Sequence, residues 1–364
     1  MEYKAILANA KKIEELLRKG YSNEKIMREV KDFSGELLSI ARARIENAKN
    51  RKLNPWFVFN EDDLRFATNE DVADYRAKRL RCNTIVDIGC GIGIQAIAFA
   101  KNCKKVIAID IDSKKIAYAR INAEVSKAKN IEFIEGDALE VLDKISKADI
   151  VFWDPERPPE EKVRSLGSFK PSFEELMKKA GKLTEKIAIE LPPQISIKED
   201  CEKEYISLNN SLNRLTGYFG PLKKCDISVV HLPSGEKLEH SGEIKELKES
   251  SIKKYLFEID KAVLKAKLQF LLGDDAVTIG DAEYITSDEM IKNPFLIPFE
   301  VLGVVKKSEL KDFLKKKNCG KAVLRGKIPE KEYWKLRKEL ESGLNGTRIA
   351  NVFLGNEIIV AAKV

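Results

Sequence analysis

Short apolar runs alternate with helical periods through the middle of the chain. The runs at residues 85–88, 105–109, 131–134, 149–153 and 186–191 are rich in β-branched and aromatic residues, which is typical of buried strands. The stretch at residues 94–100, directly after the first run, has the pattern of a buried helix. Strands that alternate with helices predict an α/β domain built on a mostly parallel sheet.

The regions on either side of this core have different patterns. Residues 1–50 carry apolar positions at helical spacing, which predicts an N-terminal helical segment. From residue 254 onward short strands and helices follow in mixed order, which predicts an α+β domain with its own antiparallel sheet. A polar, charged run ending at Ser251 is the expected linker. The expected parts are residues 1–55, 56–235 and 252–364.

Glycine and acidic residues gather where the predicted strands end. In chain order, the strand ends carry Asp87 with Gly89, Gly91 and Gly93, then Asp110, then Asp137 with Ala138, then Asp154 with Pro155. Glycine permits a sharp turn and close approach of a ligand, because it has no Cβ. The helix after that turn directs its free N–H groups and its positive dipole end toward the crevice. Asp110 is placed to accept hydrogen bonds from a ribose diol.

As a set, these strand ends resemble those of the class I S-adenosylmethionine-dependent methyltransferases, over roughly residues 60–230. The resemblance implies a Rossmann-like domain with a seven-stranded, mostly parallel sheet, and S-adenosylmethionine as cofactor. It also implies roles for these residues: Asp87, Gly89, Gly91 and Gly93 for the methionine moiety, Asp110 for the ribose, Asp137 and Ala138 for the adenine, with Ile111 and Asp154 completing the cofactor site. A Rossmann-like domain that binds another nucleotide, or none, is the alternative.

The C-terminal part carries a second resemblance. Residues 255–258, 283–288 and 321–326 look like the THUMP-like domain found behind a class I methyltransferase domain in bacterial and archaeal proteins. Residues 64–68 and the Asp-Pro-x-Arg sequence at 154–157 match the methyltransferase half of that family. The resemblance implies RNA, in particular tRNA, as the substrate. The sequence departs from the family pattern at Pro158 and Pro159, where a second arginine is expected, and at the end of the fifth strand, Ile189-Glu190-Leu191-Pro192, where a lysine before the proline is more usual.

The end of the fourth predicted strand supplies the expected catalytic residues, Asp154, Pro155 and Arg157. By resemblance, enzymes that methylate exocyclic amines have an Asp/Asn-Pro-Pro-aromatic turn here, and this chain keeps its first two residues. Arg157 could stack on a base or pair with a phosphate, or it could form a salt bridge with a nearby glutamate. Methylation at carbon 5 of a pyrimidine would require a cysteine nucleophile, and residues 149–165 contain no cysteine. A base nitrogen, with guanine as the working guess, is therefore preferred.

Positive charge is concentrated in two segments. The chain has a net charge of +7; residues 302–340 hold thirteen Lys/Arg against five Asp/Glu, and residues 1–52 hold thirteen against eight. Basic flanks around a methyltransferase domain favour a polyanionic partner, although solvated helix faces are the alternative. The candidate RNA contacts are Lys315, Lys316, Lys317, Lys321 and Arg325 in the first segment, and Thr68, Arg76 and Trp153 beside the crevice. For Thr68 and Arg76, helix packing is an equal alternative.

Cysteine and histidine usage argues against a metal site. The six cysteines are scattered without CxxC spacing and only two histidines are present, so we expect reduced thiols, no metal and a cytoplasmic protein. No apolar run approaches the roughly 20 residues that span a bilayer, and the N-terminus lacks the apolar core of a signal peptide. We therefore expect no membrane partner.

Together these features predict an S-adenosylmethionine-dependent RNA methyltransferase that modifies a base nitrogen in tRNA. Methylation of a protein or a small molecule is a second possibility, and the basic flanks argue against it. A non-catalytic RNA-binding protein that retains the methyltransferase fold is a third. The intact set of glycine and acidic strand ends argues against that third reading.

Overall fold

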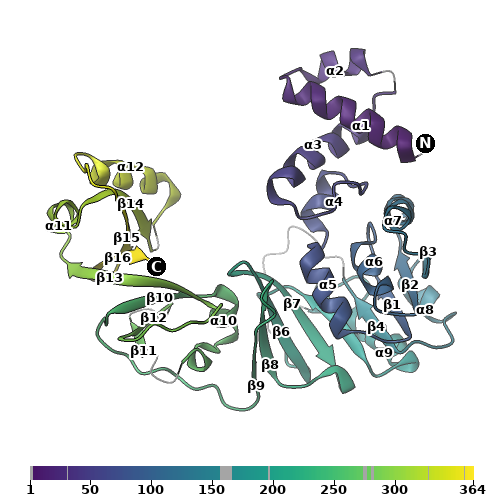
Figure 1. Cartoon of the computed structure of the whole chain (residues 1–364). Helices are drawn as coiled ribbons and strands as arrows, with labels where there is room; N and C mark the ends of the chain where they lie inside the picture. Colours follow the sequence, from purple (N-terminus) through teal and green to yellow (C-terminus); the bar gives the residue numbers. More distant parts are fainter. Residues whose placement is uncertain are drawn as a thin grey trace. The chain divides into compact units, whose positions relative to one another are not determined.

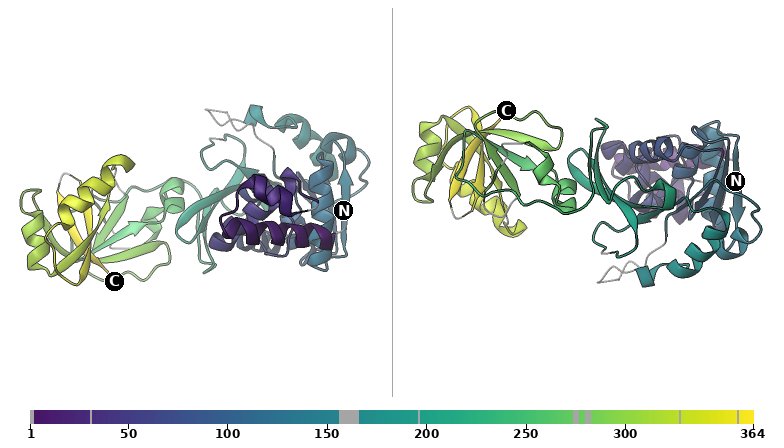
Figure 2. Two further views of the ribbon diagram at one scale, coloured as in Figure 1. Left: turned by 90° about the horizontal axis from the view of Figure 1, so that it is seen from above. Right: turned by 90° about the horizontal axis from the view of Figure 1, so that it is seen from below.

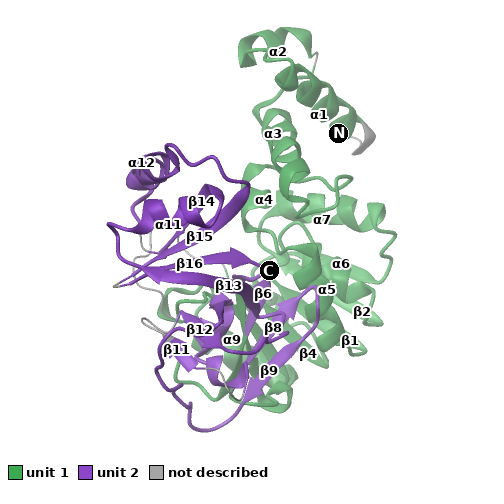
Figure 3. Ribbon diagram, turned by 60° about the vertical axis from the view of Figure 1, so that its left-hand side comes forward, with its two compact units in different colours: residues 1–204, 214–226 green, residues 205–213, 227–364 purple. Residues whose placement is uncertain are grey.

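The computed structural model describes residues 3–30, 32–155, 166–195, 197–273, 277–279, 283–326, 328–355 and 357–364. The chain forms two compact units (Figure 3). Unit 1 comprises Met1–Glu204 and Arg214–Asp226, and unit 2 comprises Tyr205–Asn213 and Ile227–Val364. The chain therefore passes between the units three times, and the expected division at 1–55, 56–235 and 252–364 stays a prediction.

Unit 1 begins with helices, as the apolar spacing predicted. Their bounds are α1 Tyr3–Arg18, α2 Asn23–Glu29, α3 Gly35–Asn50, α4 Glu61–Phe66 and α5 Glu70–Arg79. Ser22 and Ser34 cap α2 and α3, since each hydroxyl accepts a backbone N–H of the first turn. Ile13 and Ile26 are fully buried between the first three helices and give them a small core of their own.

A parallel sheet flanked by helices follows in unit 1 (Figure 1). The elements are β1 Thr84–Ile88, α6 Ile94–Ala100, β2 Lys105–Asp110, α7 Ser113–Val125, β3 Ile131–Glu135, α8 Ala138–Leu142, β4 Ile150–Trp153, η1 Leu166–Ser168, α9 Phe173–Leu183 and β5 Ile187–Leu191. Strands β3, β2, β1, β4 and β5 pair in parallel in that order. Their carboxyl ends therefore share one edge, which brings the predicted site residues together.

The sheet is larger than the seven strands expected. Its order is β3-β2-β1-β4-β5-β7-β6-β8-β9, and the remaining elements are β6 Cys201–Leu208, β7 Ser211–Phe219, η2 Gly220–Leu222, β8 Ile227–Leu232 and β9 Lys237–His240. The expectation of seven strands, which came from the family resemblance, was too small by two, and one strand that the sequence did not predict is Lys237–His240, which lies in the expected linker. This strand pairs with β8 at the sheet edge and is mostly half-exposed, so its polar composition resembles that of a loop.

Unit 2 contains a second sheet, in the order β11-β12-β10-β13-β16-β15-β14. Its elements are β10 Tyr255–Ile259, α10 Lys261–Ala266, η3 Gln269–Leu271, β11 Val277–Ile279, β12 Tyr284–Ser287, β13 Leu296–Val305, α11 Leu310–Lys316, β14 Cys319–Arg325, α12 Glu330–Glu341, β15 Arg348–Leu354 and β16 Ile358–Lys363. The sheet is mixed rather than antiparallel, because β14 and β15 pair in parallel. Helix α12 provides the crossover that a parallel pair requires.

Helix α12 packs against the core of unit 2 through one face. Tyr333, Leu336 and Leu340 are partly buried against the cluster that contains Leu324 and Val352. The Glu341 carboxylate accepts the backbone N–H of Ala322 in β14 at 2.8 Å. The helix, yellow-green in Figure 2, lies at the surface of its unit in both views. Across the described residues, no helix has both the length and the apolar character needed to cross a membrane.

Candidate active site

The turn between β1 and α6 is a tight glycine structure that touches the end of β4. Gly89, Gly91 and Gly93 have φ angles of 75°, 54° and 86°, in the left-handed region that favours glycine. A Cβ on Gly89 would lie 2.4 Å from the backbone oxygen of Asp154, and one on Gly93 would lie 3.0 Å from the Cβ of Ala119. A Cβ on Gly91 would meet no atom within 4 Å. Two glycines therefore allow close packing, and the third borders open space.

Asp110 at the end of β2 holds this turn in place. One of its carboxylate oxygens accepts the Gly91 N–H at 2.7 Å, and the other accepts the Asp112 N–H at 3.0 Å. Its backbone oxygen accepts the Gly136 N–H at 3.0 Å, at the end of β3. The side chain is 7% exposed, and the apolar side chain of Ile111 beside it is 68% exposed. The ends of β1, β2 and β3 thus meet around Asp110.

Asp87 in β1 has a buried carboxylate whose oxygens have no hydrogen-bond partner among the described residues. The side chain is 1% exposed. Burial raises the pKa of Asp87 well above its ordinary value, the carboxylates of Asp154 and Asp110 raise it further, and only Arg76 among the main contributors opposes them. A cationic ligand here would supply the positive charge that the protein leaves out.

The structure gives Asp137 an identifiable structural role. Its carboxylate accepts the backbone N–H groups of Leu139 at 2.8 Å and Glu140 at 3.3 Å, so it caps α8. Asp137 is exposed and Ala138 is half-buried. Both stand at the carboxyl edge, after β3, where the sequence placed the adenine contacts. The adenine role stays a prediction, because the capping role alone accounts for an aspartate here.

The end of β4 lies beside the glycine turn. The Asp154 N–H donates to the backbone oxygen of Ile88 at 2.9 Å, and Pro155 is buried. Asp154 itself is half-buried and contributes to the charge around Asp87 and Arg76. Of the three expected catalytic residues, Arg157 lies outside the described residues. The structure therefore brings two of them to the edge that also carries Asp87 and Asp110.

Arg76 is fully buried and forms the centre of a polar network. Its guanidinium donates to Gln95 of α6 at 2.8 Å, to Glu190 of β5 at 2.8 Å and to Thr216 of β7 at 3.3 Å. Burial alone would lower the pKa of Arg76, but the charges of Glu190, Tyr218 and Asp154 together with the Glu190 hydrogen bond outweigh it, and the net shift is upward. Glu190 also pairs with Arg214, whose Nε lies 2.7 Å from its second oxygen.

Arg76 was a candidate from the sequence, but its hydrogen-bond partners were not. With an exposure of 0%, Arg76 presents no surface to a substrate, so its described contacts are those of the packing alternative. Glu190 stands where a lysine was expected, and its two arginine partners account for the acidic residue. A buried arginine requires a buried acid as its partner, so this rule could have predicted a role for an acidic residue inside a strand, such as Glu190. Nothing in the sequence pointed to Gln95 or Thr216.

The other two crevice candidates are also buried. Thr68 is 5% exposed and Trp153 is 1% exposed. The indole of Trp153 stacks on Phe173 with ring centroids 6.4 Å apart and meets the edge of Phe169 at 5.6 Å. In this structure Trp153 is a core residue rather than an open stacking surface. By contrast, Trp56 and Phe66, which precede β1, are 64% and 61% exposed.

The basic candidates in unit 2 differ in their surroundings. Lys315, Lys316 and Lys321 are exposed, and Lys317 is half-buried with its ammonium 5.5 Å from the ring centroid of Phe313. Arg325 is a half-buried residue of β14. Its guanidinium pairs with Glu258, donates to Asn351 at 3.0 Å and lies over the ring of Phe299. Its charge is therefore already compensated, whereas three of the lysines remain open to solvent.

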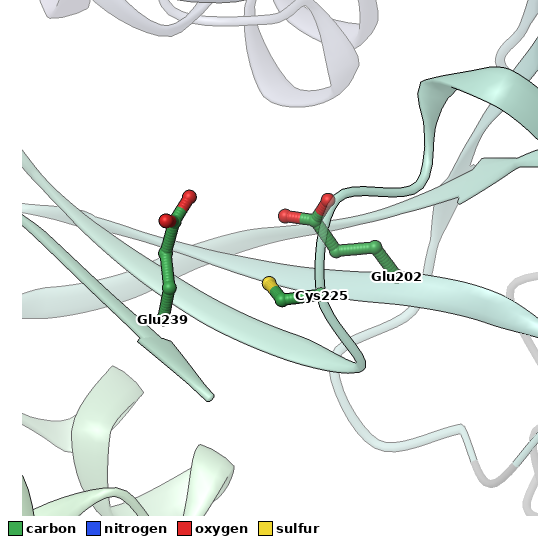
Figure 4. A group of neighbouring side chains, drawn as sticks. All are labelled: Glu202, Cys225 and Glu239. Carbon is green, nitrogen blue, oxygen red and sulfur yellow. The ribbon is translucent and has the colours of Figure 1, made fainter. Parts of the chain in front are cut away.

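A group of potential metal ligands does not make a site in either unit. Figure 4 labels Glu202, Cys225 and Glu239; the first two belong to unit 1 and the third to unit 2. The Glu202 carboxylate already pairs with Arg79 at 2.6 Å and accepts the Lys224 N–H at 3.0 Å. We assign no metal to this group.

A cavity of about 560 Å³ lies among the N-terminal helices rather than at the strand ends. Leu17, Asn47, Lys52 and Leu64 are among the residues that line it. The Lys52 ammonium donates to the backbone oxygens of Leu64 at 2.5 Å and Arg65 at 3.1 Å. Burial and the charge of Arg214 lower the pKa of Lys52 to about 8. These contacts cap α4 and do not belong to the crevice.

Comparison with known families identifies the central region. Residues 82–229 match the family model described as "Methyltransferase domain". This range contains the glycine turn, Asp110, Asp137 and Asp154. This part of the chain is therefore similar to a methyltransferase domain, in agreement with the class I resemblance of its strand ends.

Individual proteins match shorter parts or at lower identity. A stretch of 79 residues, 21% of this chain, is 35% identical to 17% of an uncharacterised RNA methyltransferase of Clostridium tetani. A stretch of 70 residues, 19% of this chain, is 43% identical to 22% of a ribosomal protein L11 methyltransferase of Clostridium botulinum. The chain thus spans about a fifth of the length of the curated relatives it matches.

One solved structure matches along the whole chain. A candidate methyltransferase from Porphyromonas gingivalis aligns with 100% of this chain and 99% of its own, with a TM-score of 0.75 at 17% identity. At this identity the likeness shows a shared fold. The matched fold therefore covers the residues of both units.

Proposed function

We propose that the chain is an S-adenosylmethionine-dependent methyltransferase whose cofactor binds at the ends of β1, β2 and β3. The observation that carries the proposal is the Asp87 carboxylate, which is buried without a hydrogen-bond partner among the described residues. S-adenosylmethionine supplies an electrophilic methyl group on a positively charged sulfur and also carries an ammonium group. Two positive charges fit the strand-end edge at which the carboxylates of Asp87, Asp110 and Asp154 are opposed mainly by Arg76.

The residues that would hold this cofactor fit it in shape as well as charge. Gly91 leaves open space where a Cβ would stand, so a ligand can approach the backbone there. Asp110 is fixed by two backbone N–H groups and keeps carboxylate oxygens at the place expected for a ribose. The exposed Ile111 offers an apolar surface beside it for the adenine.

Asp154 is the proposed catalytic residue, because it lies where the fourth strand meets the glycine turn. Its carboxylate would accept hydrogen bonds from an amine and hold the nitrogen toward the methyl group, so that positioning supplies much of the rate enhancement. Pro155 fixes the turn beside it. The role of Arg157 as a base or phosphate contact stays a prediction.

For the substrate we propose RNA, with a base nitrogen in tRNA as the target. The support is the similarity to an RNA methyltransferase, the basic segments and the resemblance of the C-terminal part to THUMP-like domains. Cys90, the cysteine in the cofactor turn, does not offer a nucleophile, because burial raises the pKa of its thiol well above the ordinary value. Guanine remains the working guess for the base.

A protein substrate is the second candidate, favoured by the similarity to a ribosomal protein L11 methyltransferase. Transfer of labelled methyl groups to unmodified total tRNA, rRNA and protein fractions distinguishes the two. We expect label in tRNA, its loss in Asp154→Ala, and no loss in the control Asp74→Ala, whose carboxylate pairs with Lys101 at the surface. Label in the protein fraction alone would replace the RNA proposal, and label in no fraction would contradict the enzyme.

A further inference from the structure

Helix α12 leaves a tryptophan in solvent. Trp334 is 66% exposed, although its neighbours Tyr333, Leu336 and Leu340 pack on the core of unit 2. Burial of a large aromatic side chain is favourable, so an indole on the outer face lacks a packing explanation. The helix itself is anchored through Glu341 and the β14 backbone, so this exposure belongs to a fixed element.

Three lysines share the outer face with this indole. Lys331, Trp334, Lys335 and Lys338 stand at positions i, i+3, i+4 and i+7, which places them on one side of a helix. All four are exposed, and none of the three lysines has an ion pair in the part of the chain that the structure describes. Arg337, which faces a different side, pairs with Glu341 at 3.0 Å. We name these four residues the α12 stripe.

A hollow borders the indole. Trp334, Arg337, Lys338, Glu341 and Ser342 line a space of about 530 Å³. The Arg337 guanidinium lies 5.5 Å from the centroid of the Trp334 ring. The rings of Tyr333 and Trp334 pack edge to face, with their centroids 5.2 Å apart. These contacts restrict the orientation of the indole. An ordered ring beside an open hollow is a suitable platform for a second flat ring.

We propose that the α12 stripe binds single-stranded RNA. An unpaired base stacks on Trp334, and Lys331, Lys335 and Lys338 contact the phosphates on either side. Aromatic stacking combined with positive charge is the general physical basis of single-strand binding. The inference rests on the proposed RNA substrate and narrows its contact surface to one helix face. It differs from the candidate set Lys315, Lys316 and Lys321, which has no exposed aromatic residue in its midst.

The first test changes the stacking surface. The whole chain is titrated with a short fluorescein-labelled oligouridylate at low salt. We expect Trp334→Ala to weaken binding roughly ten- to a hundredfold and Trp334→Phe to retain most of the affinity, since a phenyl ring still stacks. Unchanged affinity in Trp334→Ala overturns the proposal. Equal loss in both variants also overturns it, because it would indicate a packing role.

The second test measures charge. Each phosphate contact on a single strand contributes roughly 0.7 to the dependence of log affinity on log salt concentration, so Lys331→Gln with Lys335→Gln and Lys338→Gln should reduce the slope by about two. The matched control is Lys315→Gln with Lys316→Gln and Lys321→Gln, which removes the same charge elsewhere in unit 2. If the control loses the slope and the α12 variant keeps it, the stripe is not the RNA surface.

A third measurement separates this inference from the proposed function. Calorimetric binding of S-adenosylmethionine and circular dichroism should be unchanged in every α12 variant. If the wild type methylates RNA but binds no oligouridylate, the stripe proposal fails while the function stands. If oligouridylate binds through the stripe but no RNA fraction accepts a methyl group, the stripe proposal stands and the function fails. Stripe-dependent binding of proteins but not of oligouridylate overturns the RNA assignment.

Discussion

Asp87 shows how much a single residue depends on what binds beside it. The Asp-x-Gly-x-Gly-x-Gly spacing predicted where this side chain would stand, and the glycine φ angles agree with the sharp turn that the sequence required. The spacing could not reveal that both carboxylate oxygens lack partners, since this depends on how four strand ends meet. The buried charge is therefore a property of the fold and a reason to expect a cationic ligand.

The pH dependence of stability should report this charge. Because the pKa of Asp87 is raised in the folded state, the protonated form is favoured there. Without cofactor, its contribution to the free energy of unfolding is complete below the ordinary carboxyl pKa and is lost as pH rises through the folded pKa. Asp87→Asn should therefore be more stable than the wild type at neutral pH, and the difference should shrink on acidification.

Thermal unfolding between about pH 5 and 8 checks this expectation, because carboxyl groups remote from Asp87 contribute equally to both proteins and cancel in the difference. The exposed Asp74→Asn is the matched control and should follow the wild type at each pH. A constant difference between Asp87→Asn and wild type across the range would mean that the Asp87 carboxylate is not a strained group.

At the scale of elements, the apolar pattern predicted the strands whose position is decided by burial in the core. Each of the five runs predicted as strands lies within one residue of a strand in the structure. Four of them, β1, β2, β4 and β5, are almost entirely buried and give a clear signal, whereas β3 at the sheet edge buries only Phe133. The pattern failed for the edge strand β9, whose residues are polar and mostly half-exposed.

The hydrogen-bond network around Arg76 could not be predicted from the sequence for a related reason. Arginine is mostly exposed in proteins, so neither composition nor periodicity indicates that one guanidinium joins α5, α6, β5 and β7. Its contacts with these elements and its charge near Asp154 and Asp87 make it a support for the edge that carries these two acids. The buried Arg76 guanidinium therefore supplies positive charge near Asp154 and Asp87, which an apolar side chain at this position would not.

Arg76→Met should lower the free energy of unfolding by up to about 3–5 kcal/mol, because the buried Glu190 carboxylate loses one of its two arginine partners and keeps Arg214. The double variant with Glu190→Gln should lose less than the sum of the single changes, since the two residues interact directly. Urea denaturation measures both. The control Arg18→Met, at a surface pair, should change stability by less than about 0.5 kcal/mol. Normal stability with lost RNA methylation in Arg76→Met would instead identify a substrate contact.

At the scale of the whole molecule, the domain boundary was the hardest feature to predict. Composition changes at residues 236–251, but the chain passes between the units at Glu204, Asn213 and Asp226. These crossings lie inside or next to strands of the large sheet, where the sequence pattern does not separate a crossing from an ordinary strand end. A deletion after Ser251 would therefore leave parts of unit 2 behind. Point variants on the two units test their functions more cleanly.

For function, the domain could be predicted from the sequence and the substrate could not. The methyltransferase domain could be predicted because several strand ends carry independent signals in one order, and the match over residues 82–229 agrees with it. The target cannot be derived in that way, because specificity depends on a few side chains around Asp154 and on surfaces such as the α12 stripe. Trp334 illustrates this, since exposure rather than residue type makes it a candidate.

Calorimetric titration of the whole chain with S-adenosylmethionine tests the central claim most directly. We expect a dissociation constant in the micromolar range, which corresponds to about 8 kcal/mol, and no binding of NADH. Asp110→Asn should weaken binding ten- to a hundredfold, because a charged hydrogen-bond acceptor contributes roughly 1.5–3 kcal/mol. Heat released with NADH and none with S-adenosylmethionine, or full affinity in Asp110→Asn, would contradict the account.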